Sequence, residues 1–391
     1  MRIAVLHHWF VTRGGGERVA ECIAALFPSA EIFTLVSAPP GIPDSLKMRR
    51  WHHSFLQRLP LAKTHHRHFL PLYPAATESL DRRGFDLVLS SDSGPVKGVR
   101  LDPGAKHICY CHSPMRYLWD GYQQYRDSMG TVAGAAFAAV APRVREWDKR
   151  ASGRVTWFIA NSRYIADRIG RAYGREAEVI HPPIDLDRAA SVASLRPLDH
   201  YLCAGRLVSY KKTEILIEAC RKLDRKLRVV GSGPELGRLK ALAAGDPRIE
   251  FAGEVSTADL WREFAQCRAL LFAADEDFGM IPLEAQACGR PVIAYGAGGS
   301  LETVRGHADE NDSTGRYFYP QTTDAVAEAI LQWETHGEPG FDPQVARDWA
   351  RQFAVPVFLE CYLKFVIEHV PQAGASAATV EQALEVLRCN A

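Results

Sequence analysis

Apolar runs and helically spaced runs alternate along the first half of the chain. The strand-like runs are RIAVLHHWF, FDLVLSS, KHICYCH and WFIANS, and helical spacing follows the first and the last of them, over 16–27 and in RYIADRIGRAYG. Alternating strands and helices are typical of a parallel sheet with helices on both faces. HPPIDLD, at 181–187, then breaks the pattern with two prolines.

A second alternating series begins after this break. Its strand-like runs are YLCAGRLV, LRVVGSG, IEFAGEV, ALLFAAD and PVIAYG, and the helices expected between them lie at 213–222, up to 244, up to 267 and at 281–288. The two series predict an α/β fold with two doubly wound domains and a hinge near 182–195. The cleft between such domains is the default place for a ligand.

The last part of the chain has no further strand pattern. Helical spacing runs from Pro343 to about Val370, and a loop with a short amphipathic helix is expected after it. We therefore expect an N-terminal domain over 1–185, a C-terminal domain over 186–350, and a helix and tail over 351–391.

Composition mainly excludes classes of protein. The 391 residues, of which 47% are apolar and 24% charged, are enough for two or three globular domains. A net charge of +1 gives no sign of a nucleic-acid binder, and nine scattered cysteines argue against a disulfide framework. Cys109 and Cys111 share one face of a strand, which predicts packing rather than metal binding.

Targeting features are also missing from the pattern. MRIAVLHHWF lacks the long apolar stretch and cleavage site of a signal peptide, and the longest uncharged run, 128–142, is too short to span a bilayer. We expect a soluble, cytoplasmic protein.

Two glycine-rich stretches raise the question of phosphate binding. TRGGGERV, at 12–19, follows the first strand and opens the first helix, where backbone N–H groups can approach an anion. A tight turn without a ligand is the alternative, and no Walker loop is present. GSGPELG, at 231–237, resembles a dinucleotide fingerprint, but its spacing is G-x-G-x-x-x-G, so we interpret it as a turn into a helix.

The stretch GRLVSYKKTE places two cations shortly after a strand. Gly205 allows the backbone to turn, so that Arg206 and Lys211 could both face the cleft. An arginine fork together with a lysine point charge suits a diphosphate. A solvated basic loop is the alternative.

EDFGMIPLE places two carboxylates on the two sides of a turn. Glu276 falls in the loop after the strand ALLFAAD, and Pro282 suits the first turn of the next helix, so Glu284 lies one turn into that helix. Carboxylates accept paired hydrogen bonds from the vicinal hydroxyls of a sugar or a ribose. The backbone N–H groups of 278–280 lie at the helix start, where phosphate is favoured. Together these features describe a site for a nucleotide sugar.

These motifs resemble glycosyltransferase family 4, a family of retaining enzymes with the GT-B fold. Glu276 and Glu284 match its E-x7-E pattern within EDFGMIPLEA. The other matching motifs are GGGERV at 14–19, YCHSPMRYLWD at 110–120, FIANSRYIADRI at 158–169, VIHPPIDLD at 179–187, GRLVSYKK at 205–212 and GRPVIAYGAGGSLETV at 289–304. The resemblance covers nearly all of 1–355, whereas HADENDST, at 307–314, is longer than the family's usual segment.

The resemblance implies a fold and a subgroup. It implies two Rossmann-like domains that face a central cleft, with the C-terminal helix crossing back to the N-terminal domain. The motifs CHSPMRYLWD and GGGERV together resemble bacterial mannosyltransferases of O-antigen and exopolysaccharide assembly.

The resemblance also implies roles for the charged residues of the second domain. Arg206 and Lys211 would hold the donor diphosphate, with Lys212 as the alternative to Lys211. Glu276 would bind the hydroxyls of the transferred sugar and take part in catalysis. Glu284 would bind the ribose.

Further residues match the family motifs in both domains. His112 would lie beside the reacting sugar, although a packed strand-end histidine is the alternative reading. Gly15 and Gly16 would close over the phosphates. The remaining donor-side residues are Gly253, Glu254 and Val255 near the base, and Asp277, Phe278, Gly279, Met280 and Ile281 at the helix start. Arg116, Trp119 and Asp120 would line the acceptor side.

The implied reaction is transfer of a sugar with retention, without a cofactor and without a metal. Fixed cations replace the metal, and the histidine-rich stretch at 52–68 shows no ligand pattern. We expect mannose from GDP-mannose as the donor and a saccharide or lipid-linked saccharide as the acceptor, in the synthesis of a surface polysaccharide such as lipopolysaccharide. The alternatives are a UDP-sugar-dependent transferase and a protein that binds a nucleotide sugar without catalysis.

One stretch is strongly basic in a chain of balanced charge. Residues 45–77 contain no acidic side chain, and they combine six Lys and Arg residues and five histidines with Trp51, Phe55, Phe69 and Tyr73. A solvated face is one reading. The other is a surface that contacts anionic lipid on the inner face of the cell membrane, with histidines that gain charge below about pH 6.5.

Overall fold

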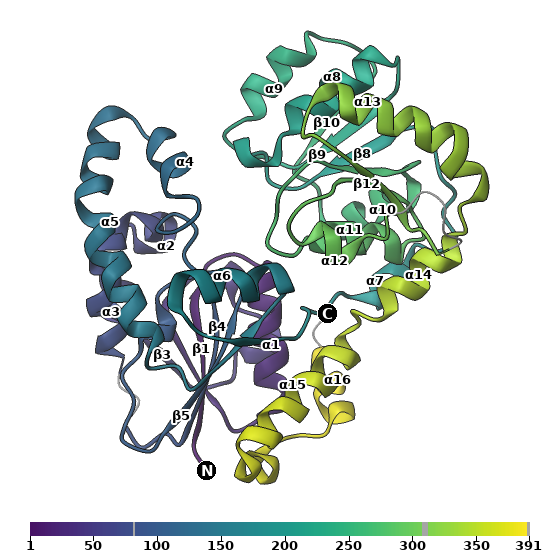
Figure 1. The fold of residues 1–391 in the computed structure, drawn as a ribbon. Coiled ribbons are helices and arrows are strands. Elements are labelled where there is room, and N and C mark those ends of the chain that lie inside the picture. The colour runs from purple at the N-terminus through teal and green to yellow at the C-terminus, as the bar shows by residue number, and fades with distance from the viewer. Residues whose placement is uncertain (81–82, 307–311, 389–391) are drawn as a thin grey trace. The chain divides into compact units, whose positions relative to one another are not determined.

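The computed structural model describes residues 1–80, 83–306 and 312–388, and it contains two compact units (Figure 1). The first unit comprises Met1–Pro183 and Val355–Ala391, and the second comprises Ile184–Ala354. The long segment HADENDST lies outside the described residues from 307 to 311.

The first unit is built on a seven-stranded parallel sheet. Its strands are β1 (Ile3–Phe10), β2 (Glu31–Ser37), β3 (Trp51–His53), β4 (Leu87–Asp92), β5 (Lys106–Cys111), β6 (Trp157–Ala160) and β7 (Ala177–Val179), in the spatial order β3-β2-β1-β4-β5-β6-β7. Ile3 and Val5 enter one apolar core, whereas Ala4 and Leu6 enter another. Because side chains alternate along a strand, this sheet is covered on both faces, as the alternating pattern predicts.

Helices cover both faces of this sheet (Figure 1). One core contains residues of α1 (Gly15–Leu26), and the other contains residues of α3 (Tyr73–Ser79) and α5 (Thr131–Ser152). The remaining α-helices before the second unit are α2 (Ala62–His65), α4 (Tyr122–Asp127) and α6 (Arg163–Tyr173). Cys109 and Cys111 are buried together against α6, which confirms the predicted packing of this pair.

The second unit has a six-stranded parallel sheet of the same type. Its strands are β8 (Tyr201–Ala204), β9 (Leu227–Val230), β10 (Ile249–Gly253), β11 (Leu270–Phe272), β12 (Val292–Tyr295) and β13 (Gly315–Phe318), in the order β10-β9-β8-β11-β12-β13. Its α-helices are α7 (Leu186–Ser191), α8 (Thr213–Lys222), α9 (Leu236–Ala243), α10 (Thr257–Gln266), α11 (Met280–Ala287), α12 (Ser300–Thr303), α13 (Thr323–Gln332) and α14 (Pro343–Arg351). GSGPELG leads into α9, as predicted for a turn before a helix.

The helix predicted from Pro343 to Val370 is wrong as one continuous element. α14 ends at Arg351, and α15 (Val355–His369) begins three residues later. Between them the backbone leaves the helix, since the Ile184 N–H donates to the Phe353 carbonyl oxygen at 2.8 Å. Pro356 then suits the first turn of α15.

The end of the chain packs in the first unit. α15 and α16 (Val380–Arg388) contribute Phe358, Tyr362 and Leu387 to the core that contains α1. The predicted return of the C-terminal helix to the N-terminal domain is confirmed. Within the described ranges, none of the helices combines the length and the apolar character needed to cross a membrane.

Candidate functional site

Each sheet reverses its strand order at one point, and the predicted residues follow the strands at those points. The reversal lies between β1 and β4 in the first sheet and between β8 and β11 in the second. Loops at the carboxyl ends of such strand pairs run in opposite directions, which leaves room for a ligand. TRGGGERV follows β1, GRLVSYKK follows β8, and EDFGMIPLE follows β11.

In the second unit, Lys211 meets Glu276. The Lys211 Nζ lies 2.9 Å from the Glu276 Oε1, and both side chains are largely buried, with exposed fractions of 14% and 18%. Burial acts to lower the pKa of Lys211, but the Glu276 carboxylate outweighs burial and the pKa is raised. Lys211 is therefore a fixed cation, and its charge also acts to lower the pKa of Glu284.

Gly205 makes room for this cation. A Cβ added to Gly205 would lie 2.7 Å from the Lys211 Nζ, and the φ of +128° at this position disfavours any side chain. Arg206, which is exposed, lines the same small pocket as Lys211 and Thr213. The Lys212 Nζ lies instead 3.9 Å from Glu214, so Lys211 rather than Lys212 occupies the position beside Glu276.

Glu284 lies on α11, and its pKa is influenced by burial and by the charges of Arg188 and Asp185. Burial raises the pKa of Glu284 to about 7; Arg188 acts to lower it and Asp185 to raise it. α11 begins after Gly279, whose φ of +87° is left-handed, and Pro282 lies in its first turn, as predicted. The N–H groups in the first turn of α11 have no carbonyl partner within the helix.

Gly299 holds the loop that carries Glu276. The Gly299 N–H donates to the Glu276 carbonyl oxygen at 2.8 Å, and a Cβ added to Gly299 would lie 2.2 Å from the Cα of Phe278. Any larger residue would push this loop away, and the same holds for Gly298, where an added Cβ would lie 2.5 Å from the Glu276 carbonyl oxygen. Asp277, Met280 and Ile281 lie in this loop and at the helix start, partly exposed.

The predicted base-side segment follows β10. The Gly231 N–H donates to the Gly253 carbonyl oxygen at 2.7 Å, and the Ser232 Oγ donates to the Glu254 carboxylate at 3.2 Å. Val255 packs against the core that contains α11. Residues 253–255 thus lie beside the turn that follows β9.

The pKa of Glu284 has a measurable consequence for stability. Because the pKa in the folded protein, about 7, exceeds the ordinary value of 4.5, folding takes up a proton between these values. The stabilising contribution of the protonated group is therefore lost as the pH rises through 7. Glu284→Gln cannot ionise, so we expect its free energy of unfolding to gain roughly 1–3 kcal/mol relative to the parent between pH 5 and pH 8.

Denaturant unfolding of the ligand-free protein at both pH values measures this difference. Glu328→Gln, an exposed position on α13, is the control and should show the same small difference at pH 5 and pH 8. A Glu284→Gln effect that does not change with pH would mean that Glu284 is ionised throughout this range.

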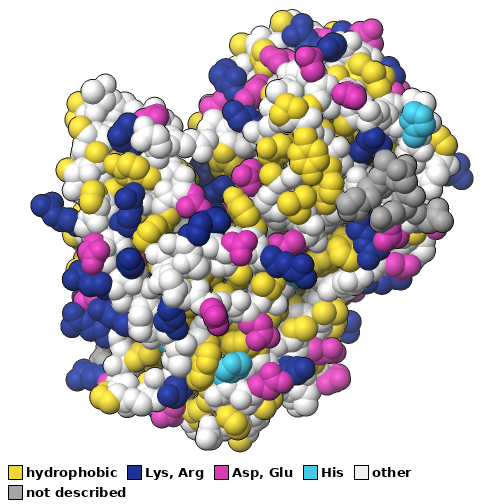
Figure 2. Space-filling model, viewed as in Figure 1, with side chains coloured by type: hydrophobic (Ala, Val, Ile, Leu, Met, Phe, Trp, Pro, Cys, Tyr) yellow, Lys and Arg dark blue, Asp and Glu magenta, His cyan; other side chains and the backbone are white. Residues whose placement is uncertain are grey.

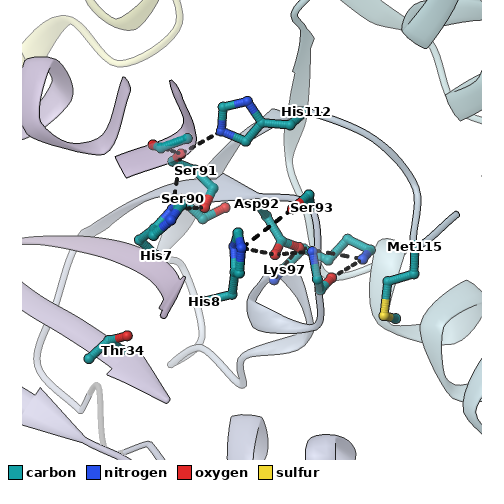
Figure 3. A network of polar contacts seen from close by, with 12 residues as sticks. His7, His8, Thr34, Ser90, Ser91, Asp92, Ser93, Lys97, His112 and Met115 are labelled. Atoms are coloured by element: carbon teal, nitrogen blue, oxygen red, sulfur yellow. Dashed lines mark hydrogen bonds and ion pairs between the residues drawn. The ribbon is translucent and has the colours of Figure 1, made fainter. Parts of the chain in front are cut away.

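In the first unit, Ser91 at the end of β4 connects His112 to the start of α1 (Figure 3). The Ser91 Oγ lies 2.7 Å from the His112 Nε2 and 3.2 Å from the Gly16 carbonyl oxygen. The His7 Nδ1 lies 2.8 Å from the Ser91 carbonyl oxygen. His112 and the start of α1 are thus connected through Ser91, and the strands β1, β4 and β5 that carry or precede these residues lie side by side in the sheet.

The two histidines beside this helix start are neutral near pH 7, and the carboxyl group of its first turn is only partly ionised there. Burial lowers the pKa of His112 to about 4, with Asp92 acting in the opposite direction, and burial lowers the pKa of His7 well below 6.5. Burial also raises the pKa of Glu17, in the first turn of α1, to about 7. The partial positive charge of the helix N-terminus is therefore only partly compensated by a carboxylate.

A buried ion network lies behind His8. The Lys97 Nζ is 2.7 Å from the Asp148 Oδ1 and 3.4 Å from the Asp92 Oδ2, and all three side chains are almost completely buried. The His8 Nδ1 lies 3.8 Å from the other oxygen of Asp92. Figure 3 shows His8, Asp92 and Lys97 close together, and in this view they lie below Ser91 and His112.

The predicted acceptor-side residues have partners within the protein. The Trp119 Nε1 donates to the Asp148 Oδ2 at 2.8 Å, and the Asp120 carboxylate lies 2.7 Å from the Arg168 Nε. The Arg116 carbonyl oxygen accepts from the Gly121 N–H at 2.8 Å, which closes the turn at the end of the YCHSPMRYLWD motif. The structure thus ties Trp119 to the buried ion network.

Several residues of this site were not predicted from the sequence. His7, Ser91 and Lys97 lie in or just after strands that were correctly predicted, yet their polar side chains were not considered further. The usable signal is their position, because polar residues at the carboxyl ends of parallel strands point toward the ligand side of such a sheet. Over residues 1–80, 83–306 and 312–388, no three His, Cys, Asp or Glu side chains gather as metal ligands.

Two family models match the chain. The model described as Glycosyltransferase Family 4 matches residues 13–188, and the model described as Glycosyl transferases group 1 matches residues 197–345. Among curated proteins, a GDP-mannose-dependent alpha-(1-6)-phosphatidylinositol monomannoside mannosyltransferase of Mycolicibacterium smegmatis is 32% identical over 199 residues, which are 43% of this chain and 50% of the relative. The chain thus spans about half the length of the curated relatives it matches first.

Solved structures share the fold at low sequence identity. Sucrose-phosphate synthase of Thermosynechococcus elongatus superposes with a TM-score of 0.70 at 17% identity, over 95% of this chain and 100% of that one. Anabaena Alr3699/HepE, solved in complex with UDP, superposes with a TM-score of 0.66 at 16% identity, over 94% and 100%. These matches show the same architecture of two parallel α/β units.

Proposed function

The chain belongs to glycosyltransferase family 4 and has the GT-B fold, and on this premise we propose that it transfers a sugar from a nucleotide sugar to an acceptor hydroxyl with retention of configuration. The observation that carries the proposal is the contact between Lys211 and Glu276 beside the start of α11. A fixed cation, a carboxylate and the start of a helix thus lie at one switch point of a parallel sheet. These are the groups that a diphosphate and sugar hydroxyls require.

Each charged residue of the second unit then has a role. Lys211 and Arg206 bind the diphosphate, Glu276 accepts hydrogen bonds from the sugar, and Glu284 accepts them from the ribose. As the bond to the sugar breaks, negative charge develops on the leaving nucleoside diphosphate. Cations that are already in position stabilise this charge in the transition state.

The first unit supplies the remaining groups. We assign His112 to the transferred sugar, because it is neutral near pH 7 and only partly buried. Gly15 and Gly16 expose the backbone N–H groups of the first turn of α1 to the phosphates. Residues 253–255 contact the base, and Arg116, Trp119 and Asp120 belong to the acceptor side.

For the donor we favour GDP-mannose. The support is the name of the mycolicibacterial relative, a GDP-mannose-dependent mannosyltransferase, together with the resemblance of YCHSPMRYLWD to mannosyltransferases of surface polysaccharides. A UDP-sugar donor is the competing assignment, because Alr3699/HepE was solved with UDP. The acceptor is a saccharide or a lipid-linked saccharide.

A thermal-shift panel followed by product analysis tests the function. GDP-mannose should raise the melting temperature more than UDP-glucose or an ADP-sugar, since the tightest ligand stabilises most. Incubation with the stabilising donor and an acceptor mixture should release nucleoside diphosphate. Stabilisation without release of nucleoside diphosphate would make the protein a binder of nucleotide sugars. If none of the nucleotides raises the melting temperature, the proposed donor site is wrong.

We expect transfer to be independent of divalent metal. The diphosphate charge is offset by Lys211, Arg206 and the start of α11, so addition of EDTA should leave the initial rate within about twofold of the untreated enzyme. Initial rates with and without chelator, and after addition of Mg²⁺ or Mn²⁺, measure this. Loss of activity in EDTA that returns with either ion would contradict the metal-free mechanism.

For the acceptor we favour a lipid-linked saccharide, reached through the basic segment 45–77. Met48 and Leu61 in this segment have exposed fractions of 95% and 68%, and Lys and Arg side chains gather along the edge of the first unit that carries α3 and α5 (Figure 2). Exposed apolar residues among cations suit anionic lipid. Acidic neighbours neutralise part of the charge, because Lys47 pairs with Asp44 and Arg50 with Glu31.

The predicted gain of charge below pH 6.5 is wrong for two of these histidines. Burial lowers the pKa of His66 to about 4, and burial also lowers the pKa of His53. These two histidines therefore do not add to the basic character of the segment in this pH range.

Co-sedimentation with anionic vesicles at low salt tests this surface. We expect the protein to pellet, and replacement of Leu61 and Lys63 by Asn and Gln should reduce the bound fraction roughly tenfold, because each basic residue contributes about 1 kcal/mol and the apolar contact is also lost. Lys240→Gln, on α9 of the second unit, is the control. A protein that stays in the supernatant with anionic vesicles would favour a water-soluble acceptor.

A further inference from the structure

Ser91 lies beside His112, and its hydroxyl contacts several polar groups. It is completely buried at the end of β4, and its hydroxyl lies within hydrogen-bond distance of three groups: the Gly16 carbonyl oxygen at 3.2 Å, the His112 Nε2 at 2.7 Å and the His7 Nδ1 at 3.2 Å. A hydroxyl has one hydrogen to donate and can accept from two donors. The positions of the hydrogens in this cluster therefore depend on one another.

The carbonyl groups decide where the hydrogens lie. The Ser91 carbonyl oxygen can only accept, and it lies 2.8 Å from the His7 Nδ1, so the Nδ1 of His7 carries its hydrogen. The Gly16 carbonyl oxygen can also only accept, so the Ser91 hydroxyl donates to it. If the hydroxyl hydrogen pointed elsewhere, two oxygens would face each other at 3.2 Å without a hydrogen between them.

His112 then has to donate to Ser91. With its own hydrogen committed to Gly16, the Ser91 Oγ accepts from the His112 Nε2–H at 2.7 Å. The imidazole is neutral near pH 7, so only one of its nitrogens carries a hydrogen. The Nδ1 of His112 is left as an acceptor, and Figure 3 shows this second ring nitrogen on the side away from Ser91.

We propose that Ser91 is a positioning residue that fixes His112 as the Nε2–H tautomer, so that its Nδ1 accepts a hydrogen bond from a hydroxyl group of the transferred sugar. This assignment rests on the proposed function and adds the direction of the hydrogen bond. It also gives the glycine turn a second role. The Gly16 carbonyl oxygen orients the Ser91 hydroxyl, and this hydroxyl in turn orients His112. A Cβ on Gly16 would lie 3.3 Å from the His7 ring and 3.6 Å from the His112 Nε2, so the turn packs directly on both histidines.

The adjacent residue offers a matched control. Ser90 is also completely buried, and its Oγ lies 2.8 Å from the Nε2 of a different histidine, His107. Neighbouring residues of a strand face opposite sides of the sheet. Ser90→Ala therefore removes a buried serine–histidine hydrogen bond of the same kind without touching His112.

The test combines the tautomer with kinetics. In ¹⁵N-histidine-labelled full-length protein at pH 7.5, with the His112 signals identified by His112→Gln, we expect the hydrogen on Nε2 in the parent and in Ser90→Ala, and a mixture of tautomers in Ser91→Ala. In transfer assays we expect kcat to fall roughly tenfold in Ser91→Ala with the donor KM within about twofold, and Ser90→Ala to match the parent.

The outcomes are distinguishable from one another. A hydrogen on the His112 Nδ1 in the parent overturns the assignment even if Ser91→Ala does not fold. Equal losses of kcat in Ser90→Ala and Ser91→Ala also overturn it, because both would then report general destabilisation of β4. Failure of the proposed function would appear as no transfer by the parent, whereas the tautomer measurement needs no activity.

Discussion

Replacing Lys211 by alanine is expected to reduce transfer by roughly two to three orders of magnitude while leaving the second unit folded. Removal of one preorganised donor to a developing negative charge costs about this much in kcat. Lys211 also balances Glu276, so its loss leaves an uncompensated carboxylate at the proposed diphosphate site. Both effects disfavour binding of the donor, so we expect a higher donor KM together with the lower kcat.

Lys212→Ala is the matched control for this experiment. It removes the same charge one residue later, but Lys212 lies beside Glu214 rather than Glu276. Its kinetics should stay within about threefold of the parent, since an exposed ion pair contributes little. Circular dichroism and melting curves check that both variants are folded. Comparable losses in the two variants would show that Lys212 shares the role of Lys211.

Arg206 can be tested on the same background. Arg206 is exposed and lines the pocket of Lys211, so Arg206→Ala alone should weaken donor binding without affecting the fold. The double variant, Arg206→Ala with Lys211→Ala, should show no measurable transfer. Loss of folding in the double variant would move these residues to a structural role.

Most of the sheet architecture could be predicted because both sheets are parallel and buried. Buried parallel strands are continuous apolar runs, so β1, β4, β5 and β6 and, in the second unit, β8 to β12 stand out in the sequence. The inner strand β2 was missed, although its side chains are buried in the same way. β3, β7 and β13 are short edge strands with few apolar residues, and none of them was predicted. α5 was also missed, because its Ala-rich first half shows no clear helical spacing of large apolar residues, and only Phe137, Val144 and Trp147 mark its buried face.

The second-unit site was more accessible to prediction than the first. Arg206, Lys211, Glu276 and Glu284 lie in two short motifs with fixed spacing, and the switch point between β8 and β11 brings the motifs together. In the first unit, Ser91 contacts residues 75 positions before it and 21 positions after it in the chain. Such contacts follow from the order of β1, β4 and β5, and no local pattern reports them.

Replacing Lys97 by methionine is expected to cause the largest loss of stability in the first unit. Burial acts to lower the pKa of Lys97, but Asp148, together with Tyr173 and Asp92, outweighs burial and the pKa is raised well above its ordinary value. Methionine keeps most of the volume but leaves two buried carboxylates without their cation. Breaking a buried ion pair in this way costs about 3–5 kcal/mol, which corresponds to a melting temperature lower by roughly 6–20 °C.

Two further variants separate charge from packing. Lys149→Met removes an exposed lysine next to Asp148 on α5 and should leave the melting temperature within about 1 °C of the parent. Lys97→Met combined with Asp148→Asn removes one of the uncompensated carboxylates, so it should recover part of the loss, as expected for residues in one network. The indole of Trp119 donates to Asp148, so its fluorescence should report the same order of variants. A Lys97→Met protein with the same melting temperature as the parent would mean that Asp92 and Asp148 do not need this cation. Trp119 would then be held by the apolar packing around it.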